Sequence, residues 1–481
     1  MLVRVLFFAA ALCAAADASA ATPGPCRVAG IRHEVLCGQL QRPLDPARPE
    51  GVKIAVHYVV VPALARRKLP DPLFLLAGGP GQSATALAGS VLPLFARLNN
   101  RRDLVLVDQR GTGRSAPLEC DDPRHQTVAE QADPERQLTL LRQCREQLQK
   151  LPHGDLRFFT TPIAMQDLDA VRRELGAERI NLVGASYGTR AGLDYLRQFP
   201  KAVRRMVLDG VAPPDMVLPA SFSTDGQAAF ESMLSGCEAD ATCTRLAPGL
   251  RGKWAAWLKG LPRAVTVLHP LSGQPESFTL TRDMALQAVR GALYSPVLAQ
   301  ALPVAIHDAT QGRLQALLTL ASGLSARKGM AIAAGMHFSV VCAEDLPRLA
   351  QSTDTLGADF GDQGARLYQR VCADWPRGEL PAAFYTLPVS TAPVMLLSGG
   401  LDPATPPRHG ARVAQALGAQ ARHVVVPHAG HGVMSLGCMP EVMQRFFDAD
   451  DDAAALAVDV RCVQGIPRPP VFQPLKTEAR P

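Results

Sequence analysis

The chain lacks several patterns that mark common classes of protein. No stretch after residue 20 reaches about 18 uninterrupted apolar residues, so neither a transmembrane helix nor a membrane anchor is expected. The net charge of +6 is spread along the chain without a basic run, and nothing indicates a nucleic-acid partner. The sequence has no C-x-x-C pair or cysteine–histidine cluster of the kind that binds zinc, and no G-x-G-x-x-G loop of the kind that binds dinucleotides.

The first 20 residues have the layout of a secretory signal peptide. Arg4 precedes an apolar run, Val5 to Ala16, and a small-residue site, Ala18-Ser19-Ala20, follows. A buried N-terminal helix is the alternative interpretation. Leu12 precedes Cys13 where a lipoprotein signal would need a small residue, so a lipid anchor is not expected. We therefore expect cleavage after Ala20 and an exported protein, located in the periplasm or outside the cell.

Cysteine usage agrees with export. Ten cysteines follow residue 20, and an even number in an oxidising compartment indicates disulfide bonds. Pairing each cysteine with its neighbour closes short loops, although ten cysteines allow many other connectivities. The expected pairs are Cys26–Cys37, Cys120–Cys144, Cys237–Cys243, Cys342–Cys372 and Cys438–Cys462.

Short apolar runs alternate with helical stretches in the first half of the chain. Residues 35–41 and 53–61 favour an N-terminal antiparallel hairpin. The later runs have the length of buried strands, with helical stretches at 163–175 and 191–199 between or after them. This alternation predicts a mostly parallel sheet that is covered by helices on both faces. The later strands are expected at 73–76, 104–107, 180–183 and 206–208.

The alternation stops near residue 213, and the pattern is then chiefly helical until about residue 387. Strand-like runs resume at 394–397 and 423–426. We interpret this as a sheet domain with a helical cap inserted after its sixth strand, followed by a proline-rich tail that is extended or poorly ordered. The predicted parts are the signal peptide 1–20, the first part of the core 21–212, the cap 213–387, the second part of the core 388–463 and the tail 464–481.

Gly184-Ala185-Ser186-Tyr187-Gly188 is a G-x-S-x-G pentapeptide between an apolar strand and a helical stretch. In that context the serine is expected on a tight strand-to-helix turn, where small neighbours avoid collisions with the adjoining strand and helix. The turn exposes the hydroxyl near a helix N-terminus, which favours developing negative charge. We interpret Ser186 as a nucleophile; a glycine-flanked turn without a chemical role is the alternative.

A serine hydroxyl is a poor nucleophile at neutral pH and needs a base within hydrogen-bond reach. His431 follows the last predicted strand, and Gly430 and Gly432 leave its loop free to bring the imidazole over the sheet edge. It is our predicted base. His428, closer to the strand, is the second candidate, and a solvated loop histidine is the interpretation without a catalytic role.

The base in turn needs a carboxylate that fixes its tautomer and stabilises the imidazolium. Asp402 comes shortly after the strand at 394–397, and the order Ser, Asp, His along the chain is the one found where a G-x-S-x-G turn supplies the nucleophile. Asp209, after the strand that ends at Leu208, is the alternative acid. Without a catalytic role, Asp402 would be a turn-former before Pro403.

Attack on a carbonyl also needs donors for the oxyanion that forms. In Gly78-Gly79-Pro80-Gly81 the absence of side chains lets backbone N–H groups face a substrate. We expect the backbone amides of Gly79 and Tyr187 to form the oxyanion hole, and Gly78 to line the substrate site. A plain glycine turn is the alternative.

Four sequence blocks occur in the order of a known family: Gly-Gly-Pro-Gly-Gln-Ser at 78–83, Asp-Gln-Arg-Gly-Thr-Gly-Arg-Ser at 108–115, Gly-Ala-Ser-Tyr-Gly-Thr-Arg at 184–190 and Asp-Pro-Ala-Thr-Pro-Pro at 402–407. Together they resemble the proline iminopeptidase and tripeptidyl aminopeptidase branch of the α/β-hydrolases, in its exported form with a TAP-like C-terminal region. The resemblance implies the α/β-hydrolase fold, a helical cap over the active site, and release of residues or short peptides, such as tripeptides or proline-containing units, from a free peptide N-terminus. Ala77 stands where proline iminopeptidases usually have histidine, which favours the tripeptidyl-type relatives over strict proline specificity.

An aminopeptidase must bind the ammonium group of its substrate, and a buried cation requires a carboxylate partner. Glu344 in the predicted cap is the first candidate for this role and Asp345 the second. The resemblance implies an acidic cap residue without fixing its position, and a solvated carboxylate at a helix end is the alternative.

The expected reaction is acyl transfer in two steps, which needs no metal and no organic cofactor. The expected partners are peptide substrates with a free N-terminus, and we expect a monomer. An esterase or another small-molecule acyl hydrolase on the same scaffold is the nearer alternative, because fold and triad do not separate it from a peptidase. A catalytically silent α/β-hydrolase that only binds peptides is the more distant one.

Overall fold

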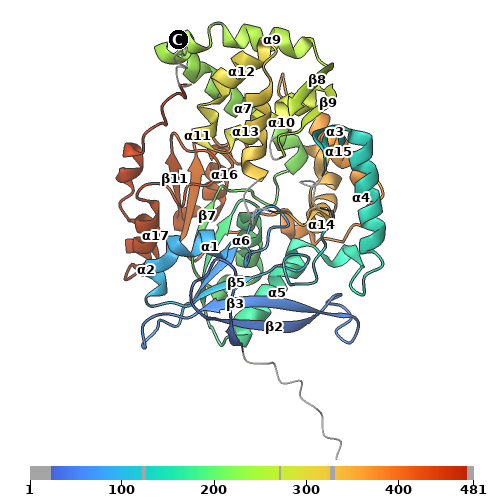
Figure 1. The fold of residues 1–481 in the computed structure, drawn as a ribbon. Coiled ribbons are helices and arrows are strands. Elements are labelled where there is room, and N and C mark those ends of the chain that lie inside the picture. The colour runs from blue at the N-terminus through green and yellow to red at the C-terminus, as the bar shows by residue number, and fades with distance from the viewer. Residues whose placement is uncertain (1–22, 122–125, 270–271, 326–330, 474–481) are drawn as a thin grey trace, which may run out of the picture.

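The computed structural model describes residues 23–121, 126–269, 272–325 and 331–473, so the predicted signal peptide lies outside the described residues. Its centre is a nine-stranded sheet with the strand order β1-β2-β3-β5-β4-β6-β7-β10-β11 (Figure 1). The strands are β1 (Gly24–Cys26), β2 (Val35–Pro43), β3 (Lys53–Val61), β4 (Leu73–Leu76), β5 (Leu104–Val107), β6 (Ile180–Ala185), β7 (Val203–Asp209), β10 (Val394–Gly399) and β11 (Ala421–Val426).

The direction of the strands follows the sequence pattern. Strands β5, β4, β6, β7, β10 and β11 run parallel, as the alternation of short apolar runs with helices predicts. Strands β2 and β3 form the predicted antiparallel hairpin, and β3 pairs antiparallel with β5. The carboxyl ends of the parallel strands therefore meet at one edge of the sheet, where side chains from distant segments are brought together.

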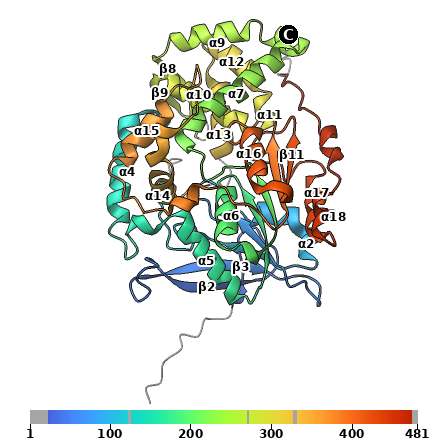
Figure 2. The same ribbon diagram turned by 180° about the vertical axis from the view of Figure 1, so that it is seen from behind.

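Helices cover both faces of the sheet, because the strand side chains are apolar in both directions. Phe74 and Leu76 of β4 belong to the core on one face, while Leu73 and Leu75 belong to the core on the other. The first face is covered by α5 (Thr161–Glu174), α6 (Tyr187–Gln198) and α16 (Pro407–Leu417), and the second by α2 (Ala96–Asn99), α17 (Met439–Asp448) and α18 (Asp452–Leu456) (Figure 2).

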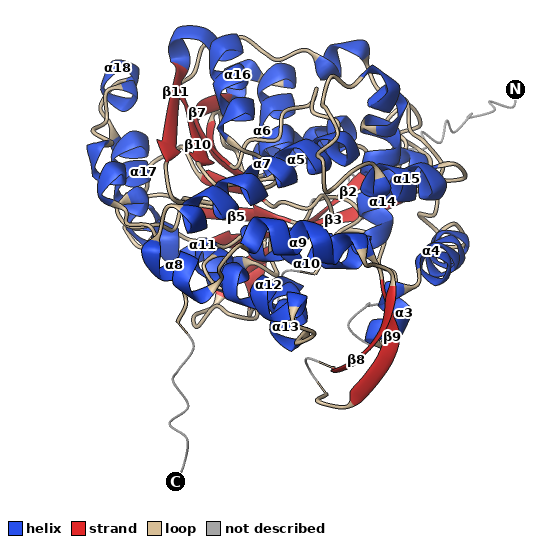
Figure 3. Ribbon diagram, turned by 90° about the horizontal axis from the view of Figure 1, so that it is seen from above, coloured by secondary structure: helices blue, strands red, loops and turns tan. Residues whose placement is uncertain are grey.

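The segment between β7 and β10 forms the helical cap, with a core of its own around Phe230 and Trp254. It lies over the sheet in Figures 1 and 3. The insertion follows the sixth strand when strands are counted from β2, because the three-residue strand β1 adds one to the count. The cap contains α7 (Leu218–Glu238), α8 (Ala241–Leu246), α9 (Leu250–Lys259), α10 (Arg282–Leu293), α11 (Pro296–Ala299), α12 (Leu302–Thr310), α13 (Gln315–Ser325), α14 (Ala334–Glu344) and α15 (Gln363–Cys372).

The cap also contains a two-stranded antiparallel hairpin, β8 (Arg263–Leu268) with β9 (Pro275–Leu280), which the sequence pattern did not reveal. A further excursion between β5 and β6 packs beside this hairpin. It holds α3 (Val128–Ala132) and α4 (Pro134–Leu148), and the N–H of Val128 donates to Glu276 of β9 at 2.7 Å. The sequence pattern assigns the segment 21–212 to the sheet domain, but α3 and α4 within it pack beside the cap.

The ten cysteines of the described residues form the five neighbour pairs expected from the sequence. Two of the bonds, Cys237–Cys243 and Cys342–Cys372, lie in the cap, and Cys438–Cys462 closes the region after β11. In the part of the chain that the structure describes, no helix has the length and apolar character needed to cross a membrane.

The C-terminal tail leaves the sheet domain and runs onto the cap as far as residue 473, the last described residue (Figure 1). Residues 466–473 have no regular secondary structure, in keeping with an extended tail. The N–H of Phe472 donates to the carbonyl of Gln300 in the cap at 3.2 Å, and Val471 packs against the cap core. Residues 474–481 of the predicted tail lie outside the described residues.

Candidate active site

Ser186 lies on a sharp turn between β6 and α6. Its backbone has φ 55° and ψ −122°, a left-handed conformation that is uncommon for a residue with a side chain. The flanking glycines make this turn possible: a Cβ atom on Gly188 would lie 2.3 Å from the carbonyl oxygen of Leu76, and one on Gly184 would lie 2.4 Å from that of Gly188. The G-x-S-x-G pattern is therefore a steric requirement, and it holds the serine at the carboxyl end of its strand.

His431 and Asp402 form a hydrogen-bonded pair on the loops after β11 and β10. The Nδ1 of His431 donates to the carboxylate of Asp402 at 2.8 Å. Thr405 donates its hydroxyl to the same carboxylate at 2.8 Å, and the backbone N–H groups of Thr405 and Ala404 donate to the other oxygen. The carboxylate is buried and saturated with donors, so it is fixed in the orientation that sets the tautomer of the imidazole.

The charges of this pair shift both pKa values in the direction that catalysis needs. Burial raises the pKa of Asp402, but the charge of His431 and the hydrogen bonds outweigh it, so the pKa lies below its usual value. Burial lowers the pKa of His431, but the charge and hydrogen bond of Asp402 and the charge of Asp209 raise it above the ordinary value of 6.5. The imidazole is thereby prepared to hold a proton taken from a nucleophile.

Asp209, the alternative acid, has a different place in the site. Its carboxylate accepts the backbone N–H groups of Val433 and Met434 at 2.9–3.0 Å and does not bond to the imidazole in the described structure. Burial raises its pKa to about 6. Asp209 thus anchors the backbone that follows His431. His428, the alternative base, is exposed on the surface.

Ser186 and His431 approach each other across the Asp209–Gly210 peptide. The N–H of Ser186 donates to the carbonyl of Asp209 at 2.8 Å, and a Cβ atom on Gly210 would lie 3.1 Å from the ring of His431. Among the described residues the hydroxyl of Ser186 makes no hydrogen bond to the imidazole. Such bonds are often long without substrate and shorten only in the reacting complex, so the direct contact of the two groups stays a prediction.

The cap reaches down to the histidine through Tyr294, which follows α10. Its carbonyl accepts the backbone N–H of His431 at 3.0 Å, and its ring meets the imidazole edge to face, with 5.1 Å between the ring centres. The imidazole of His431, the predicted base, is therefore held from the sheet side by Asp402 and from the cap side by Tyr294.

The predicted oxyanion residues lie beside the nucleophile. Gly79, with φ 110°, lines the same cavity as Ser186 and Tyr187. A Cβ atom on Gly78 would lie 3.2 Å from the Cβ of Ser186, so only glycine fits there without displacement of the nucleophile. Within the described structure the backbone N–H groups of Gly79 and Tyr187 make no hydrogen bond, and they stay our predicted oxyanion donors.

Two groups that the sequence did not single out hold this glycine loop. The buried carboxylate of Asp108 accepts the hydroxyls of Ser83 and Thr85 at 2.7 and 2.8 Å, and the N–H of Thr85 at 3.0 Å. Burial raises its pKa, but these donors and His57 lower it overall. From the cap side, His337 donates its Nδ1–H to the carbonyl of Pro80 at 3.2 Å.

The block 108–115 therefore supports the site rather than reacting in it. Gln109 donates to the hydroxyl of Tyr187 at 2.9 Å. Arg110 is fully buried and donates to Asp167 and to the carbonyls of Pro43, Leu44 and Phe158. The signal in the sequence was a run of charged and polar residues directly after a buried strand, a position where such side chains need partners.

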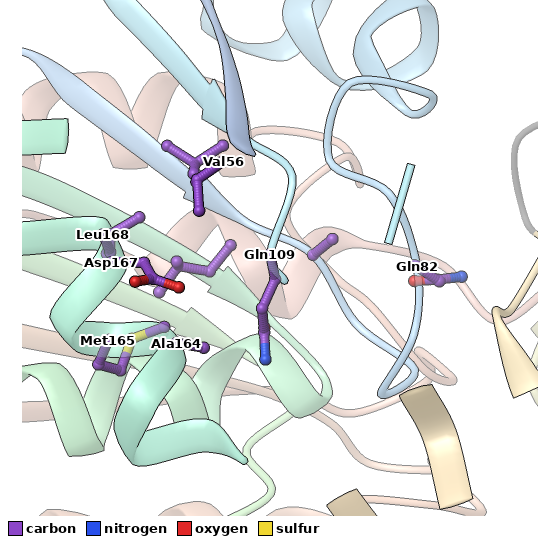
Figure 4. A pocket seen from close by; sticks show the side chains of 10 residues that line it. Val56, Gln82, Gln109, Ala164, Met165, Asp167 and Leu168 are labelled. Atoms are coloured by element: carbon purple, nitrogen blue, oxygen red, sulfur yellow. The ribbon is translucent and has the colours of Figure 1, made fainter. Parts of the chain in front are cut away.

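Two small cavities lie close to the glycine loop. The one beside Ser186 has about 60 Å³ and lies between sheet domain and cap; its lining residues are Gly79, Ser186, Tyr187, Arg190, Ala212, Met216, Leu218, Phe222, Tyr294, Ala404 and Thr405. The other, of about 20 Å³, lies toward α5 between Val56, Gln82, Gln109 and Met165 (Figure 4). Ala77 borders this second space, so its small side chain leaves room that a larger residue would occupy.

Glu344 and Asp345, the predicted ammonium ligands, are fully buried and do not line the cavity beside Ser186. Arg190, which does line it, donates two hydrogen bonds of 3.0 Å to Asp345 and lies 3.3 Å from Glu344. Glu344 also accepts the N–H and hydroxyl of Thr161 at 2.7 and 3.0 Å. Both carboxylates thus have a cationic partner in the protein, and neither is the solvated helix-end carboxylate of the alternative. The ammonium role stays a prediction.

Burial raises the pKa of Glu344 to about 7, against the opposing charge of Arg190. When Glu344, Asp345 and Arg190 are all ionised, two carboxylates face one guanidinium, and the group has a net charge of −1.

Among the described residues no group of histidine, cysteine, aspartate and glutamate has an arrangement that could hold a metal ion.

Comparisons with known proteins agree with this geometry. Residues 71–230 match the family model described as alpha/beta hydrolase fold, and residues 358–452 match the one described as TAP-like protein. Serine protease Hip1 of Mycobacterium tuberculosis is 28% identical over 450 residues, 82% of each chain. Tripeptidyl aminopeptidase of Streptomyces lividans is 34% identical over 193 residues, 37% of this chain and 36% of that one. Carboxylesterase B of Mycobacterium tuberculosis is 28% identical over 415 residues, 80% of this chain and 78% of that one.

The parallel sheet, the strained serine turn and the Asp402–His431 pair define a serine hydrolase of the α/β-hydrolase fold. The residues that match the first family model include Ser186, and those that match the second include Asp402 and His431. The chain is an α/β-hydrolase with a TAP-like C-terminal region.

Proposed function

We propose that this serine hydrolase is an exported exopeptidase that releases short peptides, above all tripeptides, from the free N-terminus of peptide substrates. The observation that carries the proposal is the partial cover of Ser186 by the cap: Leu218 and Phe222 of α7 and Tyr294 after α10 line the cavity beside this serine. A cavity that the cap narrows in this way favours a chain end over the middle of a long chain. The likeness to a tripeptidyl aminopeptidase supports the same substrate class.

The catalytic cycle follows from the positions of the side chains. The hydroxyl of Ser186 attacks the scissile carbonyl while His431 takes its proton, and Asp402 stabilises the imidazolium. The N–H groups of Gly79 and Tyr187 bind the oxyanion. His431 then protonates the leaving amine, and water, activated by the same histidine, cleaves the acyl-enzyme.

The charge distribution supports binding of an ammonium group. Glu344, Asp345 and Arg190 together carry a net charge of −1 when all three are ionised, and Arg190 is the member of this group that lines the cavity. We take this net negative charge as the basis for binding an ammonium group. A Glu344→Gln variant should therefore raise KM for free-amine peptides more than for acetylated ones. Equal changes in both would remove this residue from ammonium recognition.

The five disulfides support export to an oxidising compartment, where the chain would act as a monomer on peptides. Five bonds that each add about 2–4 kcal/mol would not persist in a reducing cytosol. N-terminal sequencing of the protein recovered outside the cytoplasm, together with its elution volume in size-exclusion chromatography, tests both points. We expect the chain to begin after Ala20.

The peptidase proposal is tested with one unblocked decapeptide and its acetylated form. We expect tripeptides from the free peptide and very slow cleavage of the acetylated one; free amino acids or dipeptides would indicate a shallower site. Internal cleavage of both peptides at equal rates would contradict the exopeptidase proposal.

An esterase is the second candidate, because the carboxylesterase relative matches over 80% of this chain. A panel of tripeptidyl anilides against simple p-nitrophenyl esters separates the two. Turnover of the esters alone would favour the esterase.

A further inference from the structure

Arg290 of α10 in the cap packs on two aromatic rings that line the cavity beside Ser186. Its guanidinium carbon lies 4.2 Å from the ring centre of Phe222 and 5.4 Å from that of Tyr294, and both rings line the cavity beside Ser186. One guanidinium nitrogen donates to the hydroxyl of Tyr294 at 3.1 Å. Tyr294 is also the residue that packs on His431, so the cation stands one side chain away from the catalytic base.

The charge of Arg290 has no anionic partner in the described structure. No carboxylate of the described residues forms an ion pair with it, and its Nε is buried without an acceptor. Other partly buried arginines of the described residues do have a carboxylate partner: Arg42 pairs with Asp167, and Arg172 pairs with Asp169. A partly buried guanidinium with free donors is costly unless a ligand supplies the acceptors.

The chemistry of the missing partner follows from the guanidinium. Its planar array of N–H groups matches a carboxylate in two parallel hydrogen bonds, and the aromatic rings on either side restrict its orientation. The effect of Arg290 on the pKa of His431 also favours an anionic ligand at this guanidinium. Arg290 lowers the pKa of His431, so an anion bound to Arg290 would relieve that opposition when the imidazolium forms.

We propose that Arg290, held by Phe222 and Tyr294, binds a carboxylate of the leaving part of the substrate. The carboxylate belongs to the leaving part because Arg290 lies on the side of His431, which protonates the leaving amine. It comes either from the free C-terminus of a short peptide or from an acidic side chain just beyond the cleaved bond. The inference rests on the proposed exopeptidase function and names the preferred substrate.

The two charged regions give an unblocked short peptide one orientation. The excess negative charge at Glu344 and Asp345 attracts its ammonium end, and Arg290 attracts its carboxylate end. A peptide with both termini free would therefore have its two ends attracted to different parts of the cap, the end of α14 and α10.

Two pairs of peptides test the proposal. Tetra-alanine is compared with its C-terminal amide, and the amidated peptide Ala-Ala-Ala-Glu-Ala with Ala-Ala-Ala-Gln-Ala. We expect kcat/KM to be about 10- to 100-fold higher for the charged member of at least one pair, and which pair responds identifies the source of the carboxylate. In Arg290→Gln this ratio should fall to about one, and in Arg290→Lys to an intermediate value, since lysine keeps the charge but not the paired donors.

Arg282 provides the matched control, because it lies on the same helix and pairs with Asp359 at the surface. Arg282→Gln should keep the wild-type ratio. Binding of the same peptides to Ser186→Ala, with and without Arg290→Gln, is measured by calorimetry, so the proposal is decided even if wild-type protein cleaves none of them. A charged-to-neutral ratio near one in wild type, or an unchanged ratio in Arg290→Gln, would overturn the proposal. Cleavage of esters but no peptide, with the binding preference intact, would overturn only the proposed function.

Discussion

Arg190 and Asp345 join the helix of the nucleophile to the cap: two hydrogen bonds of 3.0 Å link their side chains, both fully buried. Asp345 also accepts the backbone N–H of Leu218 at the start of α7, and Arg190 donates to the carbonyl of Met216. One ion pair thus fixes α6, the end of α14 and the first turn of the cap against each other. The cap is attached to the catalytic turn by charge as well as by apolar packing.

Loss of this pair should cost stability. In Arg190→Gln two buried carboxylates lose their cation, and we expect the free energy of unfolding to fall by about 3–5 kcal/mol. Urea denaturation followed by circular dichroism measures it. Arg157→Gln, at an exposed ion pair with Asp155, is the control and should change stability by less than about 1 kcal/mol. Similar losses in both variants would contradict the structural importance of the buried pair.

Removal of the nucleophile should abolish the reaction without loss of the fold. Ser186→Ala lacks the only hydroxyl placed on the strained turn, and we expect kcat to fall by roughly 10⁶-fold. Covalent labelling by a fluorophosphonate should disappear as well, while the melting temperature stays within a few degrees. The exposed Ser232 of α7 offers a control, since Ser232→Ala should label as wild type does. Labelling that persists in Ser186→Ala would identify another nucleophile.

The two carboxylates near His431 should be distinguishable by kinetics. Asp402→Asn leaves the imidazole without its acceptor, and we expect a loss of about 10⁴-fold in kcat. Asp209→Asn removes an anchor of the backbone at Val433 and Met434 and a charge near His431, but no hydrogen bond to the imidazole, so its loss of kcat should be far smaller. The reverse order of the two effects would make Asp209 the catalytic acid.

The pH dependence of kcat/KM should reflect the raised pKa of His431. The base works only when neutral, so activity is lost as the pH falls through this pKa, which lies above 6.5. The acid limb of the profile is therefore expected above pH 6.5. Because the charge of Asp209 helps to raise this pKa, the acid limb of Asp209→Asn should lie at lower pH than that of wild type. A shift toward higher pH would show that Asp209 does not act through its charge.

Gly188, two residues after Ser186, should not tolerate even a methyl group. In Gly188→Ala the new Cβ would lie 2.3 Å from the carbonyl of Leu76, and we expect a destabilisation of about 1–3 kcal/mol or more, with loss of activity. Gly252 of α9 has open space around it, so Gly252→Ala should stabilise the helix by up to about 1 kcal/mol. Thermal unfolding of both variants checks the contrast, and a stable, active Gly188→Ala would disprove the steric explanation of the motif.

The sequence predicted the sheet well because its strands are short apolar runs with sharp ends. The expected strands at 53–61, 73–76 and 104–107 have the bounds of β3, β4 and β5. Burial on both faces makes such runs continuous, and the polar turn residues that follow end them. The hairpin β8–β9 was not predicted because its two six-residue strands lie within a long segment that is otherwise helical, although their alternation of exposed and buried residues is typical of strands.

The residues of the predicted triad each follow a predicted strand of a parallel sheet, and such positions meet at one edge, so the sequence alone suggested that they lie near one another. Partners that are distant in the chain could not be inferred in this way. Nothing local to Glu344 and Asp345 indicates that Arg190, more than 150 residues earlier, occupies the space between them and the cavity. The support that Asp108 and His337 give to the glycine loop could not be predicted for the same reason, since it depends on tertiary packing and not on a local pattern.

The return of the C-terminal tail to the cap has a practical consequence. In the described part of the chain, the polypeptide passes between sheet domain and cap not only before α7 and before β10 but again after residue 465, where residues 471 and 472 dock on the cap. A gene fragment that stops at the end of the sheet domain would leave apolar cap surface uncovered. A tag or support attached after residue 473 would hold the protein by its cap, whereas an attachment near residue 23 would hold it by the sheet domain.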